Sequence, residues 1–256
     1  MRLGCVPYVN ATPLVRSLVG DPSVEIVYRH PSQLPAMLDS GEADVVLASS
    51  FEAIRTPGRK VVDGVSIASL EKADSVRLFS KVPFDRIGRL ALDSSSLTSN
   101  HLAQIVLGEA FGVRPQCAIA EPSLDTMLGD HNAAVLIGDK GMTTDAQGLH
   151  VLDLGSAWRE LTGLPFVWAL WIGREDLDPA WATTLRSARE WGSAHLEEYV
   201  EDVNARCGWG LDAVRQYLGS TMDYELTEAH WRGLTRFAEF LAAYGFVPEV
   251  RLPVRV

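Results

Sequence analysis

The sequence predicts an α/β protein with two lobes and a helical C-terminal part, and three observations indicate this. Short apolar runs alternate with helical patterns over the first two thirds of the chain, which is typical of a largely parallel sheet covered by helices. Extended segments that contain proline, Val82-Pro83-Phe84 and Leu164-Pro165-Phe166, flank a stretch that has the pattern of a small α/β unit. Two chain crossings between two such units predict a hinge, with a ligand held between the lobes.

The predicted strands share apolar runs rich in Val, Ile, Leu and Ala. Several are apolar without interruption, as expected for strands that are covered on both faces. In chain order they are Arg2–Val6, Val24–Tyr28, Asp44–Ala48, Val65–Ala68, Val76–Ser80, Arg89–Leu92, Gln116–Ala120, Ala133–Ile137, Val151–Leu154 and Phe166–Ile172.

Helices are predicted between these strands where capping and stop residues frame a helical pattern. For example, Ser32 is a suitable N-cap and Gly41 a suitable stop for one of them. The predicted helices are Pro13–Val19, Gln33–Ser40, Leu97–Phe111 and Ser156–Thr162.

The last third of the chain is predicted to be helical. Asp178-Pro179 forms an N-cap and first-turn pair, after which the pattern continues to about Arg206. A short helix, Leu211–Leu218, and a final helix from Thr227 to Tyr244 follow. Their aromatic residues recur at helical spacing, which indicates packing against a core. The crossings divide the chain into lobe 1, residues 1–84 plus 173–256, and lobe 2, residues 85–172.

Composition excludes several classes of function. The chain has 256 residues, 47% of them apolar, and a net charge of −10, which argues against nucleic-acid binding. No apolar run is long enough to span a membrane. A strand that starts at Arg2 leaves no room for a signal peptide, so we expect a cytoplasmic protein. The cysteines (Cys5, Cys117 and Cys207) lack metal-ligand spacing, and Cys5 and Cys117 are expected in the core.

Polar residues gather where predicted strands end. Asn10 follows the first strand, Ser49 and Ser50 follow Asp44–Ala48, and Ser75 precedes Val76–Ser80. Strand ends of this kind meet at the ligand site of an open α/β sheet. Taken alone, Asn10 favours an Asx-turn over a ligand-binding role. Ser49-Ser50 is equally consistent with helix capping and with ligand binding.

The densest polar cluster is Asp93-Ser94-Ser95-Ser96-Leu97-Thr98-Ser99-Asn100, between a strand and a long helix. Capping needs only one of these hydroxyls. A helix start with several hydroxyls and free N–H groups suits a carboxylate or a phosphate. Gly138 would allow close backbone approach after another strand, and Asp139 after it most simply caps a short helix.

No nucleotide-binding glycine loop, metal-ligand motif or serine nucleophile elbow is present, and the histidines are scattered. We therefore expect no metal and no cofactor, and no obvious strong base if the chain is an enzyme.

The polar residues around Asn10 belong to one of seven motifs in this chain that together point to a known family. In order and combination the set resembles the chorismate dehydratases of the futalosine route to menaquinone, over residues 1 to about 172. The motifs are Pro7-Tyr8-Val9-Asn10-Ala11-Thr12-Pro13-Leu14, Gly41-Glu42-Ala43-Asp44-Val45, Ser75-Val76-Arg77-Leu78-Phe79-Ser80, Leu92-Asp93-Ser94-Ser95-Ser96-Leu97-Thr98-Ser99, Leu136-Ile137-Gly138-Asp139, Asp153-Leu154-Gly155-Ser156-Ala157-Trp158 and Thr162-Gly163-Leu164-Pro165-Phe166-Val167-Trp168.

The resemblance implies a type-2 periplasmic-binding-protein-like fold. It also implies a lyase that removes water from chorismate, a small dianion, to give 3-[(1-carboxyvinyl)oxy]benzoate. Asn10 and Ser75 would be catalytic. The substrate-binding residues would be Ser49, Ser50, Ser95, Thr98, Ser99, Gly138 and Asp139.

Two positions depart from the family pattern. Members often have Pro-Ser where this chain has Ala48-Ser49, and a basic residue where it has Asp74. Asp74 would repel a dianion unless its side chain turned away. Arg77 is the nearest candidate for a charge partner.

Three other readings remain. A non-catalytic solute receptor shares the fold but would normally be secreted. The 1,4-dihydroxy-6-naphthoate synthase of the same pathway typically opens with a Ser-Pro-Cys-Pro-Asn-Asp-like turn and a histidine base, and neither is visible here. A transcription-regulator effector domain would need a helix-turn-helix before the first strand. The sequence does not indicate the oligomeric state.

Overall fold

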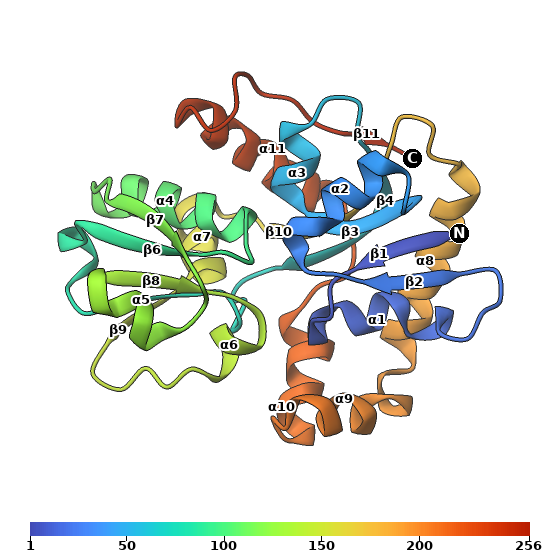
Figure 1. Cartoon of the computed structure of the whole chain (residues 1–256), viewed down its shortest axis with the longest axis horizontal. Coiled ribbons are helices and arrows are strands. Elements are labelled where there is room, and N and C mark those ends of the chain that lie inside the picture. Colours follow the sequence, from blue (N-terminus) through green and yellow to red (C-terminus); the bar gives the residue numbers. More distant parts are fainter.

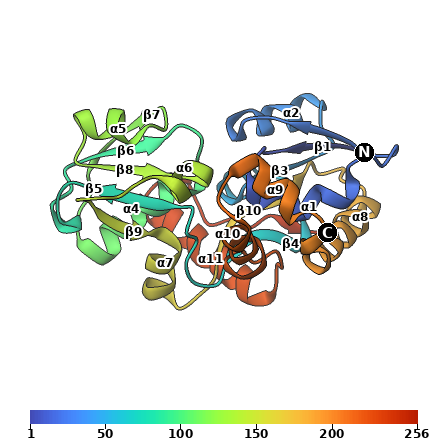
Figure 2. The same ribbon diagram turned by 90° about the horizontal axis from the view of Figure 1, so that it is seen from below.

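Two β-sheets, one in each half of the molecule, organise the fold (Figure 1). The structure is a computed structural model that describes residues 1–256. The first sheet has the order β11-β4-β10-β3-β1-β2 and the second the order β7-β6-β8-β5-β9. Figure 2 shows from a second direction that the sheets occupy separate halves. The expected two-lobed α/β architecture is confirmed.

The first sheet is built mostly from the N-terminal quarter of the chain. Its strands are β1 (Arg2–Cys5), β2 (Glu25–Tyr28), β3 (Val45–Ser49), β4 (Lys60–Ser69), β10 (Phe166–Gly173) and β11 (Val254–Arg255). The second sheet comprises β5 (Arg77–Ser80), β6 (Arg89–Asp93), β7 (Gln116–Ala120), β8 (Ala133–Leu136) and β9 (His150–Asp153). β4 begins earlier than predicted, and β11 was not predicted.

Both sheets are mixed, whereas the sequence pattern predicts a largely parallel arrangement. β1 runs parallel to β2 and β3, and β6 runs parallel to β7 and β8. β10 is antiparallel to β3 and β4, and β5 is antiparallel to β8 and β9. β5 and β10 are the first strands after the chain changes sheet, so they enter from the opposite end.

The chain changes sheet earlier than the expected lobe boundaries at 84/85 and 172/173. β5 already belongs to the second sheet, and β10 to the first. An apolar strand pattern indicates burial but does not indicate which sheet a strand joins.

The helices cover these sheets and fill the junction between them. They are α1 (Thr12–Val15), α2 (Leu34–Ser40), α3 (Ser50–Arg55), α4 (Thr98–Phe111), α5 (Leu124–Asp130), α6 (Gly138–Thr143), α7 (Leu154–Thr162), α8 (Pro179–Ala194), α9 (Val200–Cys207), α10 (Leu211–Gln216) and α11 (Glu228–Ala243). None of them is long and apolar enough to cross a membrane. The short helices α3 and α5 were not predicted as elements. A short helix capped by Asp139 was expected where α6 lies, but α6 already begins at Gly138, and Asp139 stands in its first turn and is not its N-cap.

The predicted helix over 179–206 is interrupted at His195. The backbone of His195 leaves the helical region with φ −120° and ψ 31°. Its ring stacks on Trp191 at 4.7 Å and its Nδ1 bonds the Trp191 carbonyl at 2.8 Å. A short 3-10 turn, Leu196–Glu198, follows before α9 begins at Val200.

An aromatic cluster joins the two halves. The Trp158 ring of α7 lies 5.1 Å from the Phe166 ring of β10 and 6.2 Å from the Phe237 ring of α11. All three rings are buried, and the Trp158 indole N–H donates to the Pro165 carbonyl at 3.1 Å. Rings packed edge to face at these distances stabilise the junction beyond the area that they bury.

Cys5 is buried, as predicted, but Cys117 is exposed. Cys117 lies on β7, one of the two edge strands of the second sheet. All but the last residue of β7 are exposed despite its apolar sequence. The core assignment of Cys117 is therefore wrong, because the pattern cannot distinguish an edge strand from a central one.

Candidate functional site

A cavity lies between the two sheets, at the carboxyl ends of several strands. The segments after β1, β2, β6 and β8 and the segment before β5 contribute to its wall, together with β3, β4 and β10. Its empty volume is about 910 Å³ when its open mouth is included. The strand ends of both halves therefore meet at one place, as expected for ligand sites in open α/β sheets.

The wall combines an apolar surface with hydroxyl and amide groups, and no acidic or basic side chain is on it. The larger apolar members are Val6, Leu47, Ile67, Val76, Leu97, Ile137, Trp168 and Met222. The polar members are Tyr8, Asn10, Ser32, Ser49, Ser75, Ser94, Ser95, Ser96, Thr98 and Ser99. Any bound anion must be held by neutral donors, because no cationic side chain is available on the wall.

The loop after β6 is shaped by the carboxylate of Asp93, which is fully buried. One Asp93 oxygen accepts the N–H of Ser95 at 2.8 Å and also the Ser95 hydroxyl. The other oxygen accepts the N–H of Ile137 at 3.1 Å. Ser96 caps α4, since its Oγ accepts the N–H of Ser99 at 3.2 Å. Capping thus accounts for one hydroxyl of the cluster.

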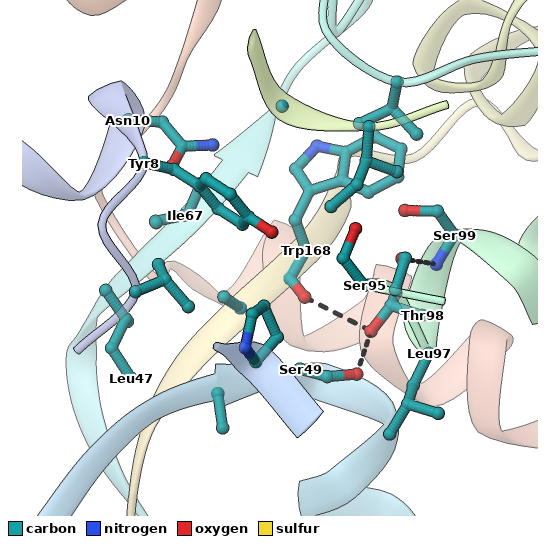
Figure 3. A pocket seen from close by; sticks show the side chains of 18 of the residues that line it. Tyr8, Asn10, Leu47, Ser49, Ile67, Ser95, Leu97, Thr98, Ser99 and Trp168 are labelled. Atoms are coloured by element: carbon teal, nitrogen blue, oxygen red, sulfur yellow. Dashed lines mark hydrogen bonds between the residues drawn. The ribbon is translucent and has the colours of Figure 1, made fainter. Parts of the chain in front are cut away.

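Thr98 connects this loop to the first sheet. Its hydroxyl bonds the hydroxyl of Ser49 at the end of β3 and donates to the Trp168 carbonyl of β10 at 3.3 Å (Figure 3). It also accepts the N–H of Phe51 at 3.3 Å. The starts of α3 and α4 therefore converge on one side chain, which has little capacity left to bind a ligand.

Ser99 is the member of the cluster whose side chain remains available. Its hydroxyl has no partner within the chain and points toward the space in front of Trp168 (Figure 3). The N–H groups of Leu97 and Thr98, at the start of the 14-residue helix α4, are also unpaired. These free donors and the positive end of the helix dipole favour a carboxylate at this point.

On the opposite wall, Asn10 and Ser75 are joined through a third residue. The Tyr217 hydroxyl donates to Ser75 Oγ at 2.7 Å and accepts from Asn10 Nδ2 at 3.4 Å. Asn10 Oδ1 is buried and has no partner. Burial is the main reason that the pKa of Tyr217 lies above its ordinary value, so the phenol stays protonated.

Tyr8 lies between these two groups of donors. Its hydroxyl points toward Ser95 (Figure 3), and burial raises the pKa of its phenol. A Cβ on Gly138 would lie 3.6 Å from the Tyr8 ring, and Gly138 has a positive φ of 60°. Glycine is suited to this conformation. Gly138 thus lies on the wall as expected, beside the Tyr8 ring.

Two of the expected site residues do not lie on the wall. Ser50 is fully buried, and its hydroxyl donates to the Val167 carbonyl at 2.7 Å. Asp139 lies beside the cavity. Burial raises the pKa of its carboxyl, while Arg206 and the Val9 N–H oppose that shift.

The two charged side chains nearest to Ser75 in the sequence, Asp74 and Arg77, do not lie on the cavity wall either. Asp74 pairs with Lys72 at 2.9 Å and accepts the Thr221 hydroxyl at 3.2 Å. The Asp74 side chain is therefore directed away from the cavity, so its charge does not face a bound dianion. Arg77 is not on the wall.

Sequence reasoning assigned no role to Asp93, Tyr8, Trp168 or Tyr217. The first three stand inside the quoted motifs, so their place beside polar cluster residues was an available signal. Tyr217 carries no such signal, because it lies 142 residues from Ser75 in the chain. No group of His, Cys, Asp or Glu side chains is placed to hold a metal ion.

Comparisons with known proteins agree with this architecture. The alkanesulfonate-binding protein of Xanthomonas axonopodis, solved with bound MOPS, is 15% identical and superposes with a TM-score of 0.69, covering 100% of this chain and 98% of that one. A protein of Archaeoglobus fulgidus, 16% identical, gives a TM-score of 0.73 and covers 96% and 98% of the two chains. These similarities show a periplasmic-binding-protein-like fold.

Similarity in sequence identifies the family, whereas the structural similarities identify only the fold. A family model described as menaquinone biosynthesis matches residues 1–243. A protein of Thermus thermophilus named chorismate dehydratase is 31% identical over 270 residues, which cover 96% of this chain and 98% of that protein. The chain therefore belongs to the menaquinone biosynthesis family that includes the chorismate dehydratases.

Proposed function

We propose that this chain is a chorismate dehydratase, a lyase that converts chorismate into 3-[(1-carboxyvinyl)oxy]benzoate. The observation that carries the proposal is the cavity wall, which offers an amide, hydroxyls and a free helix start but no carboxylate, imidazole or cationic side chain. The identity to the Thermus thermophilus protein supports chorismate as the substrate.

The reaction suits a wall without a strong base. The carbon that bears the enolpyruvyl ether loses its proton, the electron pair of that C–H bond becomes a ring double bond, and the neighbouring C–O bond breaks. The departing hydroxyl takes up a proton and leaves as water. Because the product ring is aromatic, the elimination is strongly favourable, and the protein has to align bonds and stabilise developing charge.

The two carboxylates of the substrate need separate positions. One is placed at the start of α4, against the N–H groups of Leu97 and Thr98 and the hydroxyl of Ser99. The apolar surface around Trp168 and Ile137 is suited to the ring. This orientation brings the other end of the substrate toward Asn10 and Ser75.

Asn10 and Ser75 are then the catalytic residues. We assign Asn10 to the departing hydroxyl or a carboxylate, through its amide, and Ser75 to the enolpyruvyl group, through its hydroxyl. The substrate's own side-chain carboxylate takes the ring proton and can pass it to the departing hydroxyl. Ser49 and Thr98 hold the two halves at the required spacing.

A direct assay tests the proposal. The purified chain mixed with chorismate should abolish the absorbance of the ring diene, and mass spectrometry should identify an aromatic ether lighter by one water. Absence of chorismate consumption, or a product other than this ether, would contradict the proposal. Binding of chorismate without turnover would instead indicate a receptor, the role suggested by the name of the alkanesulfonate-binding protein of Xanthomonas axonopodis.

A further inference from the structure

We propose that Tyr217 is a positioning residue for the reaction, whose hydroxyl fixes the Ser75 hydroxyl as a donor directed into the cavity. The inference rests on the proposed function, since it assigns a role at that same site. It links the helical C-terminal part of the chain to chemistry that the sequence analysis places in the first 75 residues and in the loops after β6 and β8.

The hydrogen-bond directions at Tyr217 follow from the groups involved. Asn10 Nδ2 can only donate, so the Tyr217 oxygen must accept in the 3.4 Å contact between them. The phenol proton is then free for the 2.7 Å contact with Ser75 Oγ. Since Ser75 accepts this proton, its own O–H must point elsewhere.

The remaining direction for the Ser75 proton is the cavity. Ser75 lines the cavity, and the Tyr217 bond is its only side-chain hydrogen bond within the chain. Tyr217 is 2% exposed and Ser75 1% exposed, so water does not compete for either hydroxyl inside the protein. A hydroxyl that accepts a hydrogen bond becomes a stronger donor, which would favour its bond to a substrate oxygen.

The backbone around Tyr217 holds the phenol in place. Tyr217 opens a π-helical turn, Tyr217–Thr221, that continues α10. At the other end of this turn, Thr221 donates to Asp74, the residue before Ser75. The Trp209 ring packs edge-on against Tyr217 at 5.4 Å. The turn is thus tied to the Ser75 loop at two points, and such single π-turns are frequent at functional sites.

The test compares Tyr217→Phe with two matched variants. Tyr224→Phe removes a buried hydroxyl that has no partner, and Tyr199→Phe removes one that donates to the Gly192 carbonyl at 2.7 Å, away from the cavity. We expect Tyr217→Phe to lower kcat about tenfold or more, the size of one lost hydrogen bond, with a smaller change in KM. Both control variants should keep wild-type kcat, whatever their stability.

A double-mutant cycle separates positioning from general loosening of the fold. If Tyr217 acts through Ser75, adding Tyr217→Phe to Ser75→Ala should leave kcat at the value of Ser75→Ala alone. Multiplicative losses in the double variant, or wild-type kcat in Tyr217→Phe, would overturn the inference. An inactive wild type would overturn the proposed function and this inference together, whereas an active wild type with an unaffected Tyr217→Phe overturns only the inference.

A second variant covers the case in which Tyr217→Phe does not fold. Incorporation of 3-fluorotyrosine at position 217 keeps the hydroxyl and makes it a stronger donor. We expect a changed kcat with nearly unchanged KM and thermal stability. An unchanged kcat would overturn the inference.

Discussion

The carboxylate of Asp93, at the end of β6, accepts the backbone N–H of Ile137, at the end of β8, at a distance of 3.1 Å. Its other oxygen accepts the N–H of Ser95 at 2.8 Å. One buried side chain therefore holds two loops that both line the cavity. The hydroxyls of the α4 start keep their positions relative to Gly138 because of this link.

Asp93→Asn should destabilise the fold and weaken substrate binding. An amide offers only one acceptor oxygen, so at least one buried N–H loses its partner, which costs about 2–3 kcal/mol of unfolding free energy. Urea unfolding measures this loss, and the KM for chorismate should rise. Glu121→Gln is the matched control, because Glu121 is exposed and accepts only the Ser94 hydroxyl at 3.2 Å. Equal stability of the two variants would contradict the role of Asp93.

Asn10→Ala should lower kcat about a hundredfold, the usual effect of removing one donor to developing charge. The only hydrogen bond of the Asn10 side chain within the protein is the 3.4 Å contact to the Tyr217 hydroxyl, so the variant should still fold. Turnover and thermal unfolding together measure the two effects. Asn204→Ala, which removes an amide that accepts the Gly210 N–H far from the cavity, should retain full turnover. Turnover of Asn10→Ala near the wild-type rate would remove Asn10 from the mechanism.

Gly141→Ala should impair stability and activity together. A Cβ at Gly141, in α6, would lie 2.2 Å from the Ser75 carbonyl oxygen and 2.8 Å from the Leu136 carbonyl oxygen, so backbone must move. We expect a loss of about 2–3 kcal/mol of unfolding free energy and a lower kcat, because Ser75 is displaced.

The matched substitution for Gly141→Ala is Gly129→Ala, in the short helix α5, where a Cβ would meet nothing within 4 Å. Because alanine has a higher helix propensity than glycine, the unfolding free energy of this variant should rise by up to about 1 kcal/mol. Thermal or urea unfolding of both variants measures the contrast. Equal unfolding free energies for the two variants would show that α6 does not pack closely against the backbone at Ser75.

His101 should make the fold sensitive to mild acid. Burial is the main cause that lowers the pKa of His101 below its ordinary value of 6.5, and nearby Arg55 acts in the same direction. A histidine whose pKa is lower in the folded state is fully stabilising above its unfolded pKa. That contribution is lost as the pH falls through about 6.5 toward the folded pKa.

His101→Phe isolates this effect because the ring packs between Phe51 at 4.0 Å and Phe246 at 4.7 Å, so packing is largely kept. Urea unfolding from about pH 7.5 to pH 5.5 should show a steeper loss for the wild type than for the variant. Parallel curves would indicate that His101 does not titrate on unfolding in this range.

Much of the architecture could be predicted from residue patterns. Apolar runs locate nearly all strands, and glycine stops such as Gly41, Gly112 and Gly163 adopt the left-handed conformation that ends a helix. The order of strands within each sheet could not be predicted, because β5 and β10 have the same apolar pattern as their parallel neighbours. The exposure of Cys117 escaped prediction because the apolar pattern of β7 does not show that it is an edge strand.

The candidate site was predictable as a set of loops but not as a network. Asn10, Ser75 and the serine-rich loop are visible as polar residues at strand ends, and the structure places them on one cavity. Their partners depend on long-range packing: Thr98 reaches Ser49 across the two halves, and Tyr217 reaches Ser75 from the C-terminal part. Local sequence carries no information about such contacts.

The absence of carboxylate, imidazole and cationic side chains from the cavity wall has a consequence for kinetics. No side chain there changes its protonation state between about pH 6 and pH 9, and the raised pKa of Tyr8 keeps its phenol neutral across that interval. A rate–pH profile of the proposed reaction should therefore be flat instead of bell-shaped. Any slope in it would report on groups outside the wall, such as Asp139 where α6 meets the turn after β1, and hence on how the two halves come together.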